Sequence, residues 1–216
     1  NRQSGLLTPH INNSNILGSS LQLPYFHVLS DNKDLTFKPT FFDKDILMIQ
    51  NEYRQQNKNS FFISDFNITD GYKSKSSQKE NTLIHFFSKY ESDLDFENFI
   101  VSSLDISYQK VNNDTYLKIF DTNIVDTELK PESFDTLTSD IELNLEHEKF
   151  NFTTGFTAYE DLSKPNSDRY QYILPYYNFS KNFFDNNNFG SFDFVSLGDN
   201  ILKDTNNLRS RMINNL

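Results

Sequence analysis

Apolar and polar residues alternate one by one along much of this 216-residue chain. Residues 137–147, LTSDIELNLEH, place Leu137, Ile141, Leu143 and Leu145 on one face and mostly charged or amide residues on the other. The same period of two runs through residues 35–41 (LTFKPTF), 103–109 (SLDISYQ) and 150–158 (FNFTTGFTA). Because successive side chains of a β-strand point to opposite faces of a sheet, this alternation predicts strands with one apolar and one polar face.

Turn-forming clusters separate these runs. Asn, Asp, Gly and Ser are frequent in residues 30–34, 55–60, 70–81, 111–115, 160–168 and 184–188, and each of these residue types favours turns for a backbone reason. No stretch has a convincing helical period, although residues 124–137 could hold one short helical turn that Pro131 interrupts. The sequence therefore predicts an all-β, antiparallel meander of about ten strands.

Two all-β architectures share this pattern. A soluble β-sandwich packs the apolar faces of two sheets together, whereas a transmembrane β-barrel turns them toward lipid and encloses its polar faces. The predicted strands are close to the ~9–11 residues that cross a bilayer on a tilt. Tyr and Phe gather near strand ends, as in PYF (24–26) and RYQYILPYY (169–177). These features favour part of a large transmembrane β-barrel, with a secreted β-sandwich binding module as the alternative.

Composition narrows the function classes. The chain holds 22 Phe and 11 Tyr but no Trp, and its mean hydropathy is −0.63. A net charge of −10 disfavours nucleic acid as a partner, because phosphate binding needs a positively charged surface. The absence of cysteine excludes disulfides and thiolate chemistry from this stretch.

No apolar run reaches the ~18 residues of a membrane helix, and the first residues lack a signal-peptide pattern. We expect both ends to be cuts in a longer protein.

Nothing in the chain predicts an enzyme. The four histidines are His10, His27, His85 and His147. None has a second histidine at metal-ligand spacing, so we interpret them as structural or surface residues. The acidic pairs Asp140/Glu142 and Glu146/Glu148 share strand faces, which is more often a hydrated polar face than an acid–base pair. We expect no catalytic residue, no cofactor site and no metal site.

Three prolines interrupt the first predicted strands. Pro9 lies in LLTPH (6–10), Pro24 in QLPYF (22–26) and Pro39 in TFKPTF (36–41). Proline has no backbone N–H for the ladder, so it belongs at strand edges, strand starts or bulges. We interpret Pro39 as an ordinary strand-end proline.

Four short motifs mark these consecutive strands. They are a basic residue followed by Ser-Gly, a strand start of the form L-P-Y-aromatic, a D-x-T-x-x-P strand and an E-x-R strand. In this sequence they are Arg2, Ser4 and Gly5; Leu23, Pro24, Tyr25 and Phe26; Asp34, Thr36 and Pro39; and Glu52 and Arg54. Together they closely resemble the start of the barrel domain of the LptD family of outer-membrane lipopolysaccharide-assembly proteins. Beyond residue 59 the resemblance is diffuse.

The resemblance implies a function. Residues 1–216 look like the early strands of an LptD-like outer-membrane β-barrel, with a periplasmic β-jelly-roll and further strands lying outside the sequence. Such a barrel is not an enzyme, and it inserts lipopolysaccharide into the outer leaflet of the outer membrane of a Gram-negative bacterium. The implied partners are lipopolysaccharide, an LptE-like lipoprotein in the lumen, a periplasmic LptA-like bridge and outer-membrane lipid. Another outer-membrane porin or receptor barrel is the alternative of the same shape.

The resemblance also implies a role for two of the prolines. In the family the first and last strands meet at a seam through which the lipid leaves sideways, and prolines in the first two strands weaken pairing beside it. Pro9 and Pro24 occupy the matching places, so we expect them to belong to this lateral gate. Each missing N–H removes one possible ladder bond, worth ~0.5–1.5 kcal/mol.

Overall fold

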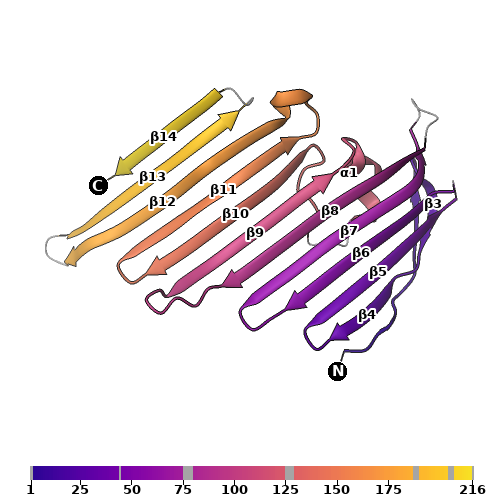
Figure 1. Ribbon diagram of the computed structural model, residues 1–216, viewed down its shortest axis with the longest axis horizontal. Coiled ribbons are helices and arrows are strands. Elements are labelled where there is room, and N and C mark those ends of the chain that lie inside the picture. The colour runs from indigo at the N-terminus through magenta and orange to yellow at the C-terminus, as the bar shows by residue number, and fades with distance from the viewer. Residues whose placement is uncertain are drawn as a thin grey trace. The chain divides into compact units, whose positions relative to one another are not determined.

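The computed structural model describes residues 2–43, 45–74, 80–124, 129–186, 190–203 and 207–215. Fourteen strands in these residues form one antiparallel sheet, and beyond the first three strands neighbours in the sheet follow chain order (Figure 1). This confirms the predicted all-β, antiparallel meander. There are more strands than expected, in part because breaks at Pro9 and Pro24 split each of the first two runs. None of the helices in the described residues has the length and apolarity that a membrane crossing needs.

The chain forms two compact units, unit 1 with residues 1–89 and 108–135 and unit 2 with residues 90–107 and 136–216. Unit 1 holds β1 (Gly5–Leu6), β2 (His10–Ser14), β3 (Gly18–Gln22), β4 (Tyr25–Ser30), β5 (Lys33–Phe42), β6 (Leu47–Gln56), β7 (Ser60–Lys73), α1 (Tyr116–Ile119) and the 3-10 turn η1 (Asp121–Asn123). Unit 2 holds β10 (Thr136–His147), β11 (Phe150–Asp161), the 3-10 turn η2 (Asn166–Arg169), β12 (Tyr170–Asn186), β13 (Gly190–Lys203) and β14 (Asn207–Asn215). Strands β8 (Glu80–Asp93) and β9 (Val101–Val111) contribute residues to both units.

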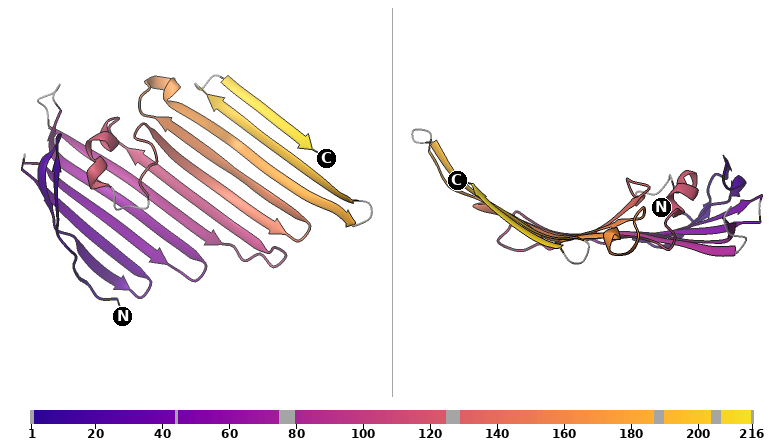
Figure 2. Two further views of the ribbon diagram at one scale, coloured as in Figure 1. Left: turned by 180° about the vertical axis from the view of Figure 1, so that it is seen from behind. Right: turned by 90° about the horizontal axis from the view of Figure 1, so that it is seen from above.

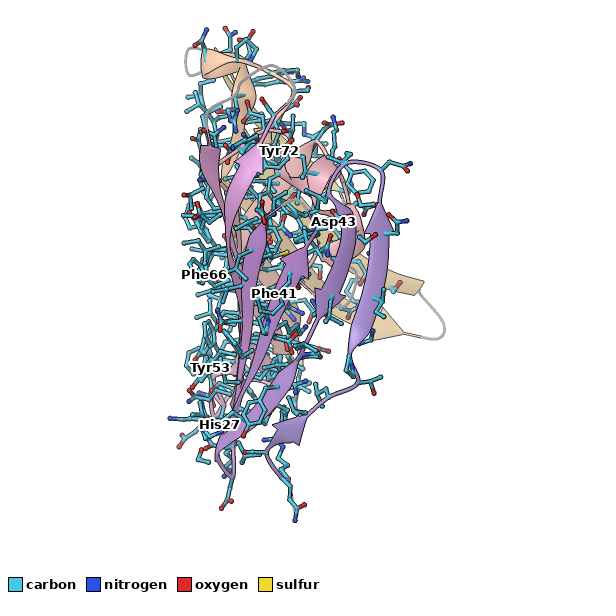
Figure 3. All side chains as sticks on the ribbon, turned by 90° about the vertical axis from the view of Figure 1, so that its right-hand side faces the viewer. His27, Phe41, Asp43, Tyr53, Phe66 and Tyr72 are labelled. Carbon is cyan, nitrogen blue, oxygen red and sulfur yellow. The ribbon has the colours of Figure 1, made fainter. Side chains whose placement is uncertain are left out.

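In unit 1 the alternation separates two faces of the sheet as the sequence predicts. Thr36 and Thr40 of β5 are buried, whereas Phe37 and Phe41 have exposed fractions of 37% and 49%. We call the two rows the polar face and the bare apolar face. The polar face includes Thr36, Thr40, Gln50, Asp65, Asn67, Thr69 and His85, together with the buried apolar residues Phe42, Met48, Ile63, Leu83 and Phe87. The bare apolar face includes Leu35, Phe37, Phe41, Leu47, Phe66, Ile68 and Phe86. In Figure 3, Phe66 and Tyr53 point to one side of these strands, and the β2–β3 hairpin lies toward the other.

The connection between β9 and β10 covers the polar face of unit 1. Its residues Tyr116, Leu117, Ile119, Phe120 and Ile124 are buried, and α1 lies on one side of the strands (Figure 2). This helical turn precedes residues 124–137, where the sequence suggested one, and residues 125–128 lie outside the described residues. A soluble sandwich would bury its apolar faces, so the exposure of Phe37, Phe41 and Phe66 on the other side of the sheet argues against that alternative.

In unit 2 the register confirms the predicted rows. Ile141 of β10 pairs with Ile106 of β9 and with Phe156 of β11. Glu142 pairs with Asp105 and with Gly155 on the opposite face. Ile141 and Phe156 have exposed fractions of 45% and 47%, so the apolar row is bare here as well.

Two tyrosines of β12 pack over glycines of the neighbouring strands. Tyr176 is paired with Gly155 of β11, and Tyr177 is paired with Gly198 of β13. A Cβ atom at position 155 would lie 2.6 Å from Tyr176 Oη and against the backbone carbonyl of Ile141. Tyr176 donates its hydroxyl hydrogen to Glu142 Oε2 at 2.6 Å. The missing side chain of Gly155 therefore leaves the space through which the Tyr176 ring reaches Glu142 of β10.

A row of aromatic rings lies near the turn between β10 and β11. His147 stacks on Phe150 with ring centroids 4.8 Å apart, and Phe99 meets both rings edge-on. The row continues through Phe179 to Phe194 of β13, with centroid distances of 5.9 and 6.3 Å. The row thus runs across neighbouring strands, from Phe99 before β9 to Phe194 within β13.

Candidate functional site at the first strands

Pro9 and Pro24 lie where the first two strand runs break. Pro9 separates β1 from β2, and Pro24 separates β3 from β4. Strand β1 pairs with β4 through two residue pairs only, Gly5 with Phe26 and Leu6 with Tyr25. Strand β2 pairs with β3 and with no other described strand. Strand β1 is therefore held to β4 by a short ladder, whereas five residue pairs join β2 to β3.

Pro24 removes one specific hydrogen bond from this ladder. Leu7 donates its backbone N–H to the Pro24 carbonyl at 2.9 Å. Two residues that face each other in this way normally exchange two bonds, N–H to C=O in both directions. Proline has no N–H to return to the Leu7 carbonyl, so the pair is half made.

Pro39 repeats this arrangement one strand further in. Leu23 donates its N–H to the Pro39 carbonyl at 3.0 Å, and the return bond is missing for the same reason. Pro39 lies inside β5, paired with Ile49 of β6, and is not the strand-end residue that the sequence suggested. The interior position is tolerated because N and O of one residue point to the same neighbour in an antiparallel sheet. The missing donor therefore faces the break at Pro24 and not the intact ladder with β6.

The register also slips by one residue along the first strand. Gly5 pairs with Phe26, whereas on the far side of Pro9 His10 pairs with Gln22. Gly5 and His10 are five positions apart, but their partners Phe26 and Gln22 are only four positions apart. The first strand thus carries one extra residue between Leu6 and His10, which is the arrangement of a β-bulge.

Four of the motif residues meet in one ionic cluster. The Asp34 carboxylate is fully buried, with Oδ2 at 2.6 Å from Arg2 Nη2 and Oδ1 at 2.9 Å from Arg54 Nε. Glu52 Oε1 lies 3.6 Å from Arg54 Nε, and Glu52 Oε2 lies 3.2 Å from Lys38 Nζ. Positive and negative groups alternate along this line, which we call the Asp34 cluster.

The other motif residues lie beside β4. Ser4 Oγ accepts a hydrogen bond from the Val28 backbone N–H at 2.8 Å. Leu23 and Tyr25 each have an exposed fraction of 38%, and Tyr25 stacks with His27 at 6.2 Å. A Cβ atom at Gly5 would meet no atom within 4 Å, so steric space does not require glycine there.

A buried polar group that the sequence did not reveal lies under α1. His85 is wholly buried, its ring stacked on Phe87 at 4.3 Å and its Nε2 atom 3.2 Å from Asp65 Oδ2. Gln50 donates from Nε2 to the same Asp65 oxygen at 2.8 Å. His85 thus has the structural role expected of it. Among the described residues no three His, Asp or Glu side chains are arranged to hold a metal ion.

Tyr116 of α1 completes this group. Its hydroxyl oxygen accepts a hydrogen bond from Asn67 Nδ2 and lies 2.7 Å from His85 Nδ1. Because Asn67 already donates to the phenol oxygen, the phenol hydrogen is the one that can be donated to Nδ1. Burial raises the pKa of Tyr116 above the ordinary 10.0, because a phenolate would lose its hydration there. The phenol therefore stays protonated and can donate.

Part of the chain is similar in sequence to known proteins. No protein-family model matches the chain. LPS-assembly protein LptD from Legionella pneumophila strains Lens and Paris is 26% identical over 132 residues, which cover 57% of this chain and 16% of each relative. LPS-assembly protein LptD from Ectopseudomonas mendocina is 41% identical over 59 residues, which cover 27% of this chain and 6% of that relative. The chain thus spans a small fraction of these relatives, and over part of its own length it is similar to LPS-assembly proteins named LptD.

Proposed function

We propose that this chain forms the early strands of an LptD-like outer-membrane β-barrel that assembles lipopolysaccharide into the outer leaflet. The observation that carries the proposal is the partition of unit 1, where the connection between β9 and β10 covers the polar face and leaves the apolar face bare. The partial similarity to proteins named LptD supports the same assignment.

The bare apolar face fits a lipid environment. Phe37, Phe41, Phe66 and Phe86 have exposed fractions between 37% and 49%, and each buried Å² of apolar surface is worth about 25 cal/mol. Strands β5 and β6 have 10 residues each and β10 and β11 have 12, close to the ~9–11 residues that cross a bilayer on a tilt. Lipid would remove the apolar row from water, and the polar row would face a wet lumen.

The lengths of the connections support an orientation. The two longest, residues 112–135 and 162–169, follow β9 and β11 and lie at the same end of the antiparallel strands. The turn at residues 148–149 lies at the opposite end and is short. Barrels of bacterial outer membranes have short periplasmic turns and longer extracellular loops. In the proposed barrel the segment before β1 would therefore lie on the periplasmic side.

The remaining elements of the proposal follow from the family resemblance. Lipopolysaccharide would arrive through an upstream periplasmic domain in contact with an LptA-like bridge, and an LptE-like lipoprotein would occupy the lumen. The protein would be a transporter without catalytic residues or cofactors. Release would occur sideways at a seam beside β1, where the half-made pair of Leu7 and Pro24 weakens the closed ladder.

The double variant P9A/P24A in the full-length protein tests this function. Restored N–H groups at these positions could stabilise the closed seam by ~1–3 kcal/mol in total, and ~1.4 kcal/mol already lowers a rare open population about tenfold. We expect less surface lipopolysaccharide and higher permeability to large antibiotics at normal barrel abundance. P39A is the matched control, because it restores a donor between β5 and the second strand and not at the seam. Normal export by P9A/P24A would refute a gating role for these prolines, and normal surface lipopolysaccharide after depletion of the whole protein would refute the function itself.

A further inference from the structure

The Asp34 cluster joins two arginines that the sheet holds to different extents. Arg54 lies within β6 and is the ladder partner of Asp34, so the sheet fixes its position. Arg2 lies before β1, whose ladder with β4 has two residue pairs. The two arginine side chains are similarly exposed, 46% for Arg2 and 38% for Arg54, and the Asp34 carboxylate is fully buried, so the backbone sets the difference between the arginines. Of the two cations that neutralise Asp34, Arg2 is the one that can leave.

Departure of Arg2 would not leave the buried carboxylate without a countercharge. Removing one partner of a buried ion pair is normally strongly destabilising, because the other charge is stranded away from water. Here Arg54 Nε stays at 2.9 Å from Asp34 Oδ1. Glu52 and Lys38 extend the alternation of charge beyond Arg54. The cluster can therefore lose Arg2 and keep its remaining charges paired.

Arg2 and Ser4 both tie the start of the chain to the sheet through side chains. Arg2 reaches Asp34 of β5, and Ser4 Oγ accepts from the Val28 N–H of β4. Between Ser4 and Pro9, the residue pairs with β4 are those of Gly5 and Leu6. The Arg2 ion pair therefore adds to a β1 attachment that otherwise consists of two residue pairs and the Leu7 bond to Pro24.

From this geometry we infer that Arg2 and Asp34 form an electrostatic latch that holds the first strand closed, and that opening of the seam begins with release of Arg2. The inference rests on the proposed function, since it assigns a closing device to the same seam. The pair is half exposed on the Arg2 side, so dissolved salt weakens it. Arg2 and Asp34 are positioning residues for β1 and need not touch the lipid.

Hydrogen exchange of the full-length protein in lipid nanodiscs tests the latch. The reporters are the backbone amides of residues 5–7, where the Leu7 N–H is bonded to Pro24. In R2Q these amides should exchange about tenfold faster, because local opening sets their exchange rate. In R2K, which keeps the charge, the rate should stay near that of the wild type, and high salt should move the wild type toward R2Q. R211Q is the matched control, because Arg211 pairs with Asp199 between β13 and β14.

The outcomes separate the latch from the proposed function. Equal exchange at residues 5–7 in R2Q and the wild type overturns the latch, whatever the export phenotype is. Faster exchange in R2Q with loss of protection across β5 and β6 also overturns it, because Arg2 would then hold the whole sheet. Faster exchange confined to residues 5–7 supports the latch. If export of lipopolysaccharide is then unchanged, the latch stands and the proposed release route beside β1 is refuted.

Discussion

The phenol oxygen of Tyr116 lies 2.7 Å from Nδ1 of His85, and this contact joins the connection between β9 and β10 to strand β8. Asn67 of β7 donates to the same oxygen. Both rings are wholly buried, so water cannot replace either bond. One side chain therefore fixes α1 against two strands of unit 1.

Replacing Tyr116 by Phe should detach this anchor. Y116F keeps the ring but removes the hydroxyl group, and leaves His85 Nδ1 without its partner. An unmade buried hydrogen bond costs about 1–3 kcal/mol, so the amides of residues 116–120 should exchange at least fivefold faster. Y53F is the control, because Tyr53 donates locally to Gln55 at 2.9 Å. Unchanged protection of α1 in Y116F would show that apolar packing alone holds it.

The titration of Tyr116 should be absent from the folded protein. Since burial raises its pKa above 10.0, this phenol should keep its proton while exposed tyrosines ionise. The tyrosinate absorbance of wild type and Y116F should therefore coincide near pH 10.0, and differ by one tyrosine when both are unfolded in denaturant. The unfolded chain releases this proton more easily than the native chain, so the contribution of Tyr116 to stability is present below pH 10.0 and falls as the pH rises above it.

A side chain at Gly155 should destabilise unit 2. The Cβ atom of G155A would lie 2.6 Å from Tyr176 Oη and against the Ile141 carbonyl, which cannot move unless β10 bends. Overpacking of this kind costs about 1–3 kcal/mol, measurable as a lower urea midpoint for the full-length barrel in lipid. G5A provides the comparison, because its Cβ has no neighbour within 4 Å. Equal midpoints for G155A and the wild type would mean that Tyr176 can swing aside.

Single cysteines along β10 should report the orientation of its faces. E142C, N144C and E146C of the full-length protein should react with a water-soluble thiol reagent in lipid, because these positions face the proposed lumen. I141C, L143C and L145C should react slowly, since Ile141 belongs to the bare apolar row. All six should react equally after unfolding. Similar rates at odd and even positions in the folded barrel would contradict the lipid-facing assignment.

Local alternation allowed much of the sheet to be predicted. A period of two predicts that Phe37 and Phe41 lie on the face opposite Thr36 and Thr40. The structure confirms this arrangement. The breaks at Pro9 and Pro24 follow from the missing donors. Periodicity could not reveal that Arg2, Asp34 and Arg54 meet, because these residues are far apart in the sequence and only the sheet register brings them together.

The anchor under α1 was missed for a similar reason. Its contacts join Tyr116 to residues 31 and 49 positions away, and no local pattern records them. A signal was nevertheless present, because residues 116–120 (YLKIF) place four large apolar side chains in a connection. Connections usually run over the surface and are polar, so such a cluster indicates a segment that folds back onto the sheet.

The extra residue in the first strand shifts the phase of its side chains. Leu6 and Ile11 are five positions apart, so strict alternation would place them on opposite faces. Leu6 pairs with Tyr25, which pairs with Phe37, and Ile11 pairs with Leu21, which pairs with Phe41. Both therefore lie on the bare apolar face, with exposed fractions of 79% and 84%. Without the bulge this odd spacing would turn Ile11 toward the polar side, whereas deletion of Thr8 would make the spacing even and keep both residues on the bare apolar face. The bulge beside Pro9 thus keeps Leu6 and Ile11 on the same apolar face, although the ladder of this strand is weakened.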